Sequence, residues 1–383
     1  MVPGGPGGPT PLACRPVIAV RVLVFVAGVA LCLVVVDSAV RTFVVPRGTV
    51  STLTRAVFRT SRMFFGAIAR PSRSYELRDR VMALYAPFTL LVLPGVWLVL
   101  LFAGFTGIFW AVLGKSWSVS IRLSGSSLLT LGFDRPASLT GELIAFVEAA
   151  LGLGTVALLI SYLPAIYGNF SRREAMVTQL SVRAGTPPSA VELLERGARS
   201  GYLATLDGLF ERWEAWFVEL EETHQSMGSL AFFRSPNSGR SWITAAGALL
   251  DSAALRYAVL DIPFTPQAAT CLRAGFLALR AIADVFDQPV DHDPAPDEPI
   301  SITRDEFDEV CARLARAGAP LKGDRDEAWR TFAGWRVNYD QALLGLAALV
   351  MAPYAPWSSD RSLRIYRPRL VRRSPRTAGP PVA

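Results

Sequence analysis

A short, half-polar segment between two long apolar runs contains the residues of this sequence that could do chemistry. The segment covers residues 126–134, and the apolar runs cover residues 81–114 and 139–168. This order predicts an outer helix, a loop that enters the membrane and turns back, and an inner helix. Non-helical backbone is tolerated at membrane depth only where protein or a water-filled cavity surrounds it. We therefore expect the segment to line an ion pathway.

The residues around this segment resemble the bacterial two-transmembrane potassium-channel family. Residues 141–163 resemble that family's inner helix, and residues 126–133 resemble its pore helix and filter. The resemblance implies a homotetramer in which each subunit gives one pore loop to a shared selectivity filter. Backbone carbonyls of such a filter replace the water shell of a monovalent cation, with potassium expected first. The residues implied at the filter are Thr130, Leu131, Gly132, Phe133 and Asp134.

The match to the family's filter stops at its fourth residue. Asp134 follows Phe133 directly, so the family's second glycine is absent. A filter strand aims successive carbonyls inward through alternating backbone conformations, and only Gly132 adopts these at little steric cost. The sequence leaves open a weakly cation-selective pore, selectivity for another ion, or no conduction. A non-conducting, membrane-anchored scaffold or sensor on the same fold is therefore a second hypothesis.

Three residues of the inner run are candidates for lining the pore or acting as a hinge. Glu148 is ionisable, and such residues within a membrane are costly and usually face a cavity or a partner. It either lines the pore or makes a hydrogen bond behind the pore helix, for instance with Ser126 or Ser127. Gly152 and Gly154 lie at the depth of the resembled family's gating hinge. Close packing of helices through small residues is the alternative for both glycines.

The apolar runs predict an all-α membrane protein with three transmembrane helices. Hydrophobic residues make up 51% of the chain. A first run over residues 17–36 has the length of about 20 residues that a spanning helix needs. A cleaved signal peptide is the alternative for this run. In the second run, Pro94 and Gly95 predict a kink, because proline removes a backbone donor and clashes with the preceding turn.

The distribution of arginine predicts the orientation in the membrane. Nine arginines lie between the first and second runs, against three acidic residues. The positive-inside rule places that loop in the cytoplasm, and Arg172 and Arg173 after the third run agree with it. We expect a multi-pass protein of the inner (plasma) membrane with its N-terminus outside and its C-terminus in the cytoplasm.

Two arginine-containing segments are candidate lipid-binding sites. Apolar residues and arginines are interleaved over residues 50–68, which suits a helix in the headgroup plane held partly by anionic lipid. An ordinary solvated loop is the alternative there. The second segment is the arginine-rich tail, for which nucleic acid is not an expected partner. The candidate lipid-binding residues are Arg55, Arg59, Arg62, Arg372 and Arg373.

The sequence divides into five parts. They are a leader and first helix (1–37), a basic loop (38–80), the pore region (81–170), a helical cytoplasmic domain (171–357) and a basic disordered tail (358–383). In the cytoplasmic domain, apolar periodicity and capping signals predict helices over residues 188–199, 202–220, 239–260, 266–286, 303–317 and 324–352. Thr303 and Glu306 form a capping-box pattern at the start of the fifth of these helices. An unidentified cytoplasmic partner is expected for this domain.

No constellation for catalysis stands out in the chain. There are only two histidines, and the sequence has neither a nucleophile elbow nor a phosphate-binding glycine loop. The motif Asp291-His292-Asp293 could take a divalent ion, but a single short acidic loop is usually a solvated linker. We expect no enzyme activity, no metal site and no cofactor.

Overall fold

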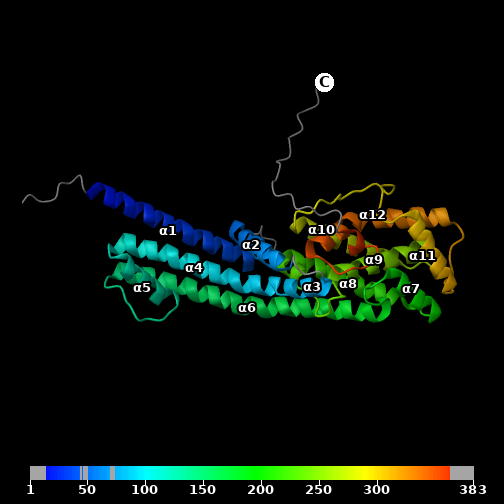
Figure 1. Cartoon of the computed structure of the whole chain (residues 1–383), viewed down its shortest axis with the longest axis horizontal. Helices are drawn as coiled ribbons and strands as arrows, with labels where there is room; N and C mark the ends of the chain where they lie inside the picture. The colour runs from blue at the N-terminus through cyan, green and yellow to red at the C-terminus, as the bar shows by residue number, and fades with distance from the viewer. Residues whose placement is uncertain (1–13, 44, 46–50, 70–73, 363–383) are drawn as a thin grey trace, which may run out of the picture. The chain divides into compact units, whose positions relative to one another are not determined.

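The computed structural model describes residues 14–43, 45, 51–69 and 74–362. The elements within these residues are helices, and none is a strand (Figure 1). The prediction of an all-α chain with three helices long and apolar enough to cross a membrane is confirmed at this level. The described residues divide into two compact units. The first contains the described residues up to 172 and residues 222–234, and the second contains residues 173–221 and 235–362.

The three candidate membrane spans cover residues 17–43, 75–113 and 139–184, and the first unit contains the first two and the part of the third up to Arg172. Its elements are α1 (Cys14–Phe43), α2 (Thr52–Ala69), α3 (Tyr75–Ala83), α4 (Tyr85–Leu113), α5 (Trp117–Leu128), the part of α6 (Leu139–Ala184) up to Arg172, and the 3-10 helix η2 (Gly228–Phe232).

The second apolar run is divided near its start rather than at its middle. Helix α4 continues through Pro94, where the sequence predicted a kink, and the boundary between α3 and α4 lies at Leu84. Pro87 explains this position. It has no N–H to donate to the carbonyl of Ala83, so α3 cannot run on, whereas proline is tolerated in the first turn of α4.

A buried apolar core joins the spans of the first unit. Helix α4 contributes Trp97, Leu101 and Phe109, α1 and α5 add residues, and Ile144 of α6 packs against them. Helices α1 and α4 cross closely, because a methyl group at Gly28 would lie 2.6 Å from the carbonyl oxygen of Gly104. Small residues allow such close approach between membrane helices.

The second unit is a helical bundle around α9 (Trp242–Val259), in which every residue except Tyr257 is buried. Helices α7, α10 and α12 pack against it. The predicted helices are present with bounds shifted by a few residues, and the predicted capping box of Thr303 and Glu306 is formed. The other elements are α7 (Ala190–Arg199), η1 (Leu203–Thr205), α8 (Asp207–Ser226, shared with the first unit), α10 (Pro266–Val285), α11 (Arg304–Arg316), α12 (Arg325–Val350) and α13 (Ser359–Ser362).

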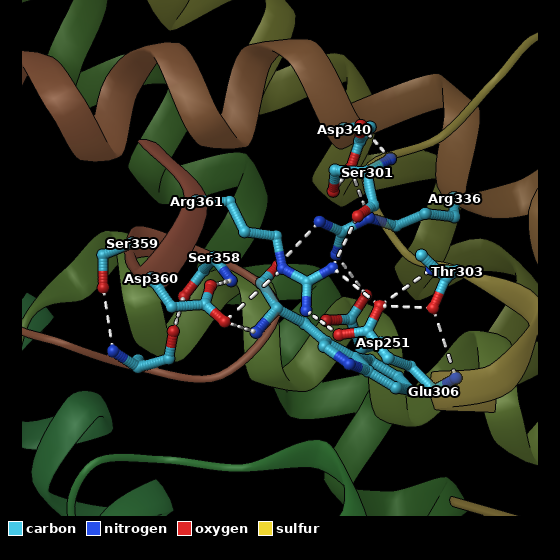
Figure 2. A network of polar contacts seen from close by, with 12 residues as sticks. Asp251, Ser301, Thr303, Glu306, Arg336, Asp340, Ser358, Ser359, Asp360 and Arg361 are labelled. Carbon is cyan, nitrogen blue, oxygen red and sulfur yellow. Dashed lines mark hydrogen bonds and ion pairs between the residues drawn. The ribbon is translucent and has the colours of Figure 1, made fainter. Parts of the chain in front are cut away.

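A buried polar network ties the last described residues to this bundle (Figure 2). Arg336 of α12 is 0% exposed. Its Nη1 donates to Asp251 Oδ1 at 2.6 Å and its Nε to Asp340 Oδ1 at 2.8 Å. Its Nη2 donates to the carbonyl oxygen of Trp357 at 2.7 Å. The guanidinium therefore holds α9, α12 and the C-terminal segment together.

Candidate functional site

The residues that the sequence places at a filter lie between α5 and α6. Helix α5 has 12 residues, or about 18 Å, whereas the hydrocarbon core is about 30 Å thick. Residues 129–138 are not helical, and α6 begins at Leu139. The side chains of Leu129, Leu131 and Phe133 are 56%, 61% and 63% exposed. Helix α5 is thus too short to cross the hydrocarbon core. The side chains of the segment that follows it are largely exposed within the described part of the chain.

The C-terminal end of α5 fixes the backbone of this segment. The N–H of Thr130 donates to the carbonyl of Ser127 at 3.0 Å, and the N–H of Leu131 donates to that of Ser126 at 2.9 Å. This pair of bonds is the Schellman arrangement, in which the residue after the cap is left-handed and is usually glycine. Thr130 occupies that position with φ 53°. Such a conformation is strained for a β-branched residue.

Gly132 is also left-handed, with φ 70°. The backbone therefore alternates, because Leu131, between the two left-handed residues Thr130 and Gly132, has a negative φ. Within the part of the chain that the structure describes, a side chain at Gly132 would meet nothing within 4 Å, so the need for glycine there arises from the backbone conformation and not from crowding.

Ser126 anchors the far end of the segment. Its hydroxyl donates to the carbonyl of Asp134 and accepts from the N–H of Asp134, both at 3.0 Å. Ser126 is buried, and these two bonds are partly buried. The Asp134 carboxylate lies 3.3 Å from Nε of the exposed Arg122, a surface pair that contributes little stability. The five predicted filter residues thus form one turn held by α5.

Glu148 lies on the side of α6 that faces α5 and is fully buried. The hydroxyl of Ser124 donates to Glu148 Oε1 at 2.5 Å and also lies 3.2 Å from the carbonyl oxygen of Phe102. This contact joins α6, α5 and α4. Glu148 Oε2 has no hydrogen-bond partner among the described residues. Within one chain Glu148 therefore makes the bond behind α5 that the sequence offered as one alternative.

The two glycines of α6 differ in their surroundings. A methyl group at Gly152 would lie 2.2 Å from the carbonyl oxygen of Leu128, so Gly152 lets α6 touch the end of α5. A methyl group at Gly154 would meet nothing within 4 Å. The exposed residues Ala150, Ala157 and Ser161 share the face of α6 that carries Gly154. Packing accounts for Gly152, and a hinge at either glycine stays a prediction.

The candidate lipid-binding arginines are described only in part. Arg55 and Arg59 of α2 are exposed and Arg62 is half-buried, with its guanidinium 5.7 Å from the centre of the Phe232 ring. Arg372 and Arg373 lie outside the described residues. Arg173, which supported the predicted orientation, lies in the second unit. Its side chain is buried and pairs with Glu174 at 3.0 Å.

Sequence reasoning missed the role of residues 222–234, which pack within the first unit. The ring of Phe232 lies 5.6 Å from that of Tyr85, and Arg234 forms an ion pair with the buried Asp79. The sequence of this segment suits a turn between two packed helices equally well. Its position in the first unit depends on contacts distant in sequence, and no local signal marks it.

The network around Arg336 was also missed, and its chemistry is structural. Burial lowers the pKa of the Arg336 guanidinium, but the carboxylates of Asp251 and Asp340 outweigh this and hold that pKa above its ordinary value. Arg361 pairs with Glu306 in the same way. These charges neutralise one another within the chain. Among the described residues, no group of three or more His, Cys, Asp and Glu side chains is placed to hold a metal ion.

No protein-family model, curated protein or solved structure matches this chain.

Proposed function

We propose that the chain is a cation channel of the plasma membrane, assembled as a homotetramer with its pore at the segment between α5 and α6. The observation that carries the proposal is the arrangement around α5. A helix too short to cross lies between two candidate spans and is joined to both through Ser124. It ends in an exposed segment with left-handed residues at Thr130 and Gly132. A loop of this kind at membrane depth requires a water-filled or protein-lined surrounding.

Assembly follows from the same geometry. One segment cannot surround an ion, so copies must meet at a shared axis, and closed rotational symmetry is the usual solution. The uncovered side chains of Leu131 and Phe133 and the exposed side chains on the Gly154 face of α6, which include Leu143 and Val147 beside small residues, supply surfaces for this contact. Native mass spectrometry in mild detergent is expected to give tetramers.

The arginine distribution supports the orientation of the proposed channel. The loop between α5 and α6 faces the exterior, and the second unit lies in the cytoplasm, where its helices bind a protein partner that gates the pore. The ion is a monovalent cation, with potassium as the first candidate. The missing second glycine after Phe133 argues for weaker selectivity than the resembled family has.

A membrane-anchored scaffold or sensor is the second candidate function. The observation that favours it is the use of the Thr130 and Leu131 N–H groups in the cap of α5, which gives this backbone a structural role. The absence of the family's second glycine favours the same conclusion. In this alternative the turn after α5 is a folding device, and the helices of the second unit recruit a partner without any ion flow.

Reconstitution into liposomes separates the two functions. The wild-type protein should pass potassium and sodium, and a glycine inserted between Phe133 and Asp134 should raise the preference for potassium by restoring the family's spacing. A glycine inserted between Ala137 and Ser138 is the matched control, because it lengthens the loop beyond the filter. If the wild type and both insertion variants pass no ions under voltage, pH change and membrane tension, the result supports the scaffold or sensor function instead.

A further inference from the structure

Helix α2 displays two different exposed surfaces on opposite sides. Its buried residues are Thr54, Ser61, Phe65 and Ala69, which share one face. At 3.6 residues per turn, Arg55, Arg59 and Arg62 fall within about 60° of one another beside that face. Met63, Phe64 and Ile68 are 69%, 57% and 47% exposed. Phe64 and Ile68 lie about 140–180° from Arg59 around the helix, whereas Met63 lies about 40° from Arg59, on the arginine side.

A cluster of hydroxyl groups fixes the packed face of α2. Ser38 of α1 shares hydrogen bonds with Ser51 at 2.7 Å and with Thr54 at 3.0 Å, and it accepts one from Trp97 Nε1 of α4 at 3.1 Å. Thr42 of α1 bonds Thr54 at 2.9 Å. Buried hydroxyl groups that are all paired hold a helix in one orientation. The arginine side and the apolar side of α2 are therefore fixed relative to the spans.

The depth of α2 follows from where this cluster lies on α1. The first apolar run ends at Val36, and the next residues, Asp37 and Ser38, begin the polar end of α1. Helix α2 is attached at this first polar turn. Its neighbour on α4 is Tyr85, which donates to the carbonyl of Phe58 at 3.2 Å and is the first residue of that helix. Trp97, which bonds Ser38, lies roughly 18 Å from Tyr85 along α4, so α2 is attached along the first turns of α4 and not at a single level.

We propose that α2 lies in the membrane interface and binds anionic phospholipid headgroups through Arg55, Arg59 and Arg62, while Phe64 and Ile68 enter the acyl region. Helix α2 contains three arginines and no acidic residue, and no ion pair of Arg55 or Arg59 occurs among the described residues. A cationic side facing phosphate and an apolar side facing acyl chains is the arrangement of an interfacial helix. The proposal does not depend on ion conduction.

Native mass spectrometry of the protein released from nanodiscs of phosphatidylglycerol and phosphatidylcholine tests the headgroup contact. The double variant Arg55→Gln/Arg59→Gln should retain several-fold less phosphatidylglycerol than wild type. The matched control Arg199→Gln/Arg316→Gln removes the same charge from exposed arginines of the second unit and should retain the wild-type amount. Equal retention by wild type and both variants would overturn the proposal.

Spin labels test the depth of α2 separately from its charge. In a background lacking the native cysteines, a label at Phe64→Cys should collide with oxygen dissolved in lipid and avoid a water-soluble nickel reagent. A label on the arginine side, at Arg59→Cys, should show the reverse. A label at position 64 that prefers the nickel reagent would place α2 in water and overturn the proposal, even if the retention result were as expected.

Discussion

At the scale of single residues, the contact between Glu148 and Ser124 fixes the position of α5. Glutamine at position 148 keeps this contact, since its amide N–H can donate to the Ser124 hydroxyl and leave that hydroxyl free to donate to Phe102. Alanine removes this contact, so the buried Ser124 hydroxyl loses its Glu148 partner, which costs about 1–3 kcal/mol. Glu148→Gln should therefore unfold near the wild-type temperature in detergent, and Glu148→Ala well below it.

Amide hydrogen exchange shows whether the destabilisation in these variants is located in α5. Protection of α5 should fall in Glu148→Ala and in Ser124→Ala, and it should persist in Glu148→Gln. If Glu148→Ala leaves both the unfolding temperature and the protection of α5 unchanged, the contact does not brace the segment.

The candidate site was only partly predictable from the sequence at this scale. Thr130 to Asp134 could be identified as a group because they lie between two apolar runs, and this order is visible in the sequence alone. The anchoring serines were not predictable, since which side of α5 faces α6 is decided by packing. Ser124 bonds Glu148 and Ser126 bonds Asp134 for that reason, whereas the sequence offered Ser126 or Ser127 as partners of Glu148.

At the scale of elements, the close contact between α5 and α6 depends on Gly152. A methyl group there would overlap the carbonyl oxygen of Leu128, and overpacking of this kind costs typically about 1–3 kcal/mol. Gly152→Ala should lower the unfolding temperature in detergent. Gly154→Ala in the same helix should leave it unchanged or raised, because its methyl group would meet open space and alanine favours a helix. Equal effects would exclude the close contact.

The capping of α11 makes the second unit sensitive to acid. Burial raises the pKa of Glu306, but the hydrogen bonds from Arg361 and from Thr303 outweigh it and hold that pKa below its ordinary value. A carboxylate with a depressed pKa contributes stability above its unfolded pKa, about 4.3, that is lost as the pH falls through the folded value. The stability difference between wild type and Glu306→Gln should therefore shrink below about pH 4.

Circular dichroism of thermal unfolding at several pH values measures that difference. The wild type should exceed Glu306→Gln near neutral pH, and the two should converge in acid. Carboxylates titrate between roughly pH 3 and pH 7. A stability difference between wild type and Glu306→Gln that stays constant over this range would contradict the contribution of Glu306.

Helices were predictable as elements because apolar periodicity and caps are local. Thr303 and Glu306 identified the start of α11, and the apolar runs identified α1, α4 and α6. The break between α3 and α4 at Leu84 was not predicted, although Pro87 was a sufficient signal for it. The kink was predicted at Pro94 and Gly95 instead, because a proline and a glycine are adjacent there. The role of Arg336 could not be predicted, since its partners come from elements distant in sequence.

At the scale of the whole molecule, the arginine distribution predicts which ends of the spans face the cytoplasm. Cysteine at Ser116 should be modified by a membrane-impermeant reagent applied to intact cells, whereas cysteine at Ser200 should not. Both positions are exposed in the structure, so burial within the protein does not explain a failure to react. Permeabilised cells serve as the control, in which both positions react. Reversed labelling would invert the orientation and the proposed pore.

Potassium flux into liposomes, compared between Gly132→Ala and Gly95→Ala, tests conduction through the segment after α5 most directly. Each methyl group would meet nothing within 4 Å, but only Gly132 is left-handed, where a side chain costs roughly 1–2 kcal/mol. The proposal predicts that Gly132→Ala stops the flux while the oligomer persists, and that Gly95→Ala conducts like wild type. Unchanged flux through Gly132→Ala, or no flux through wild type, would contradict it.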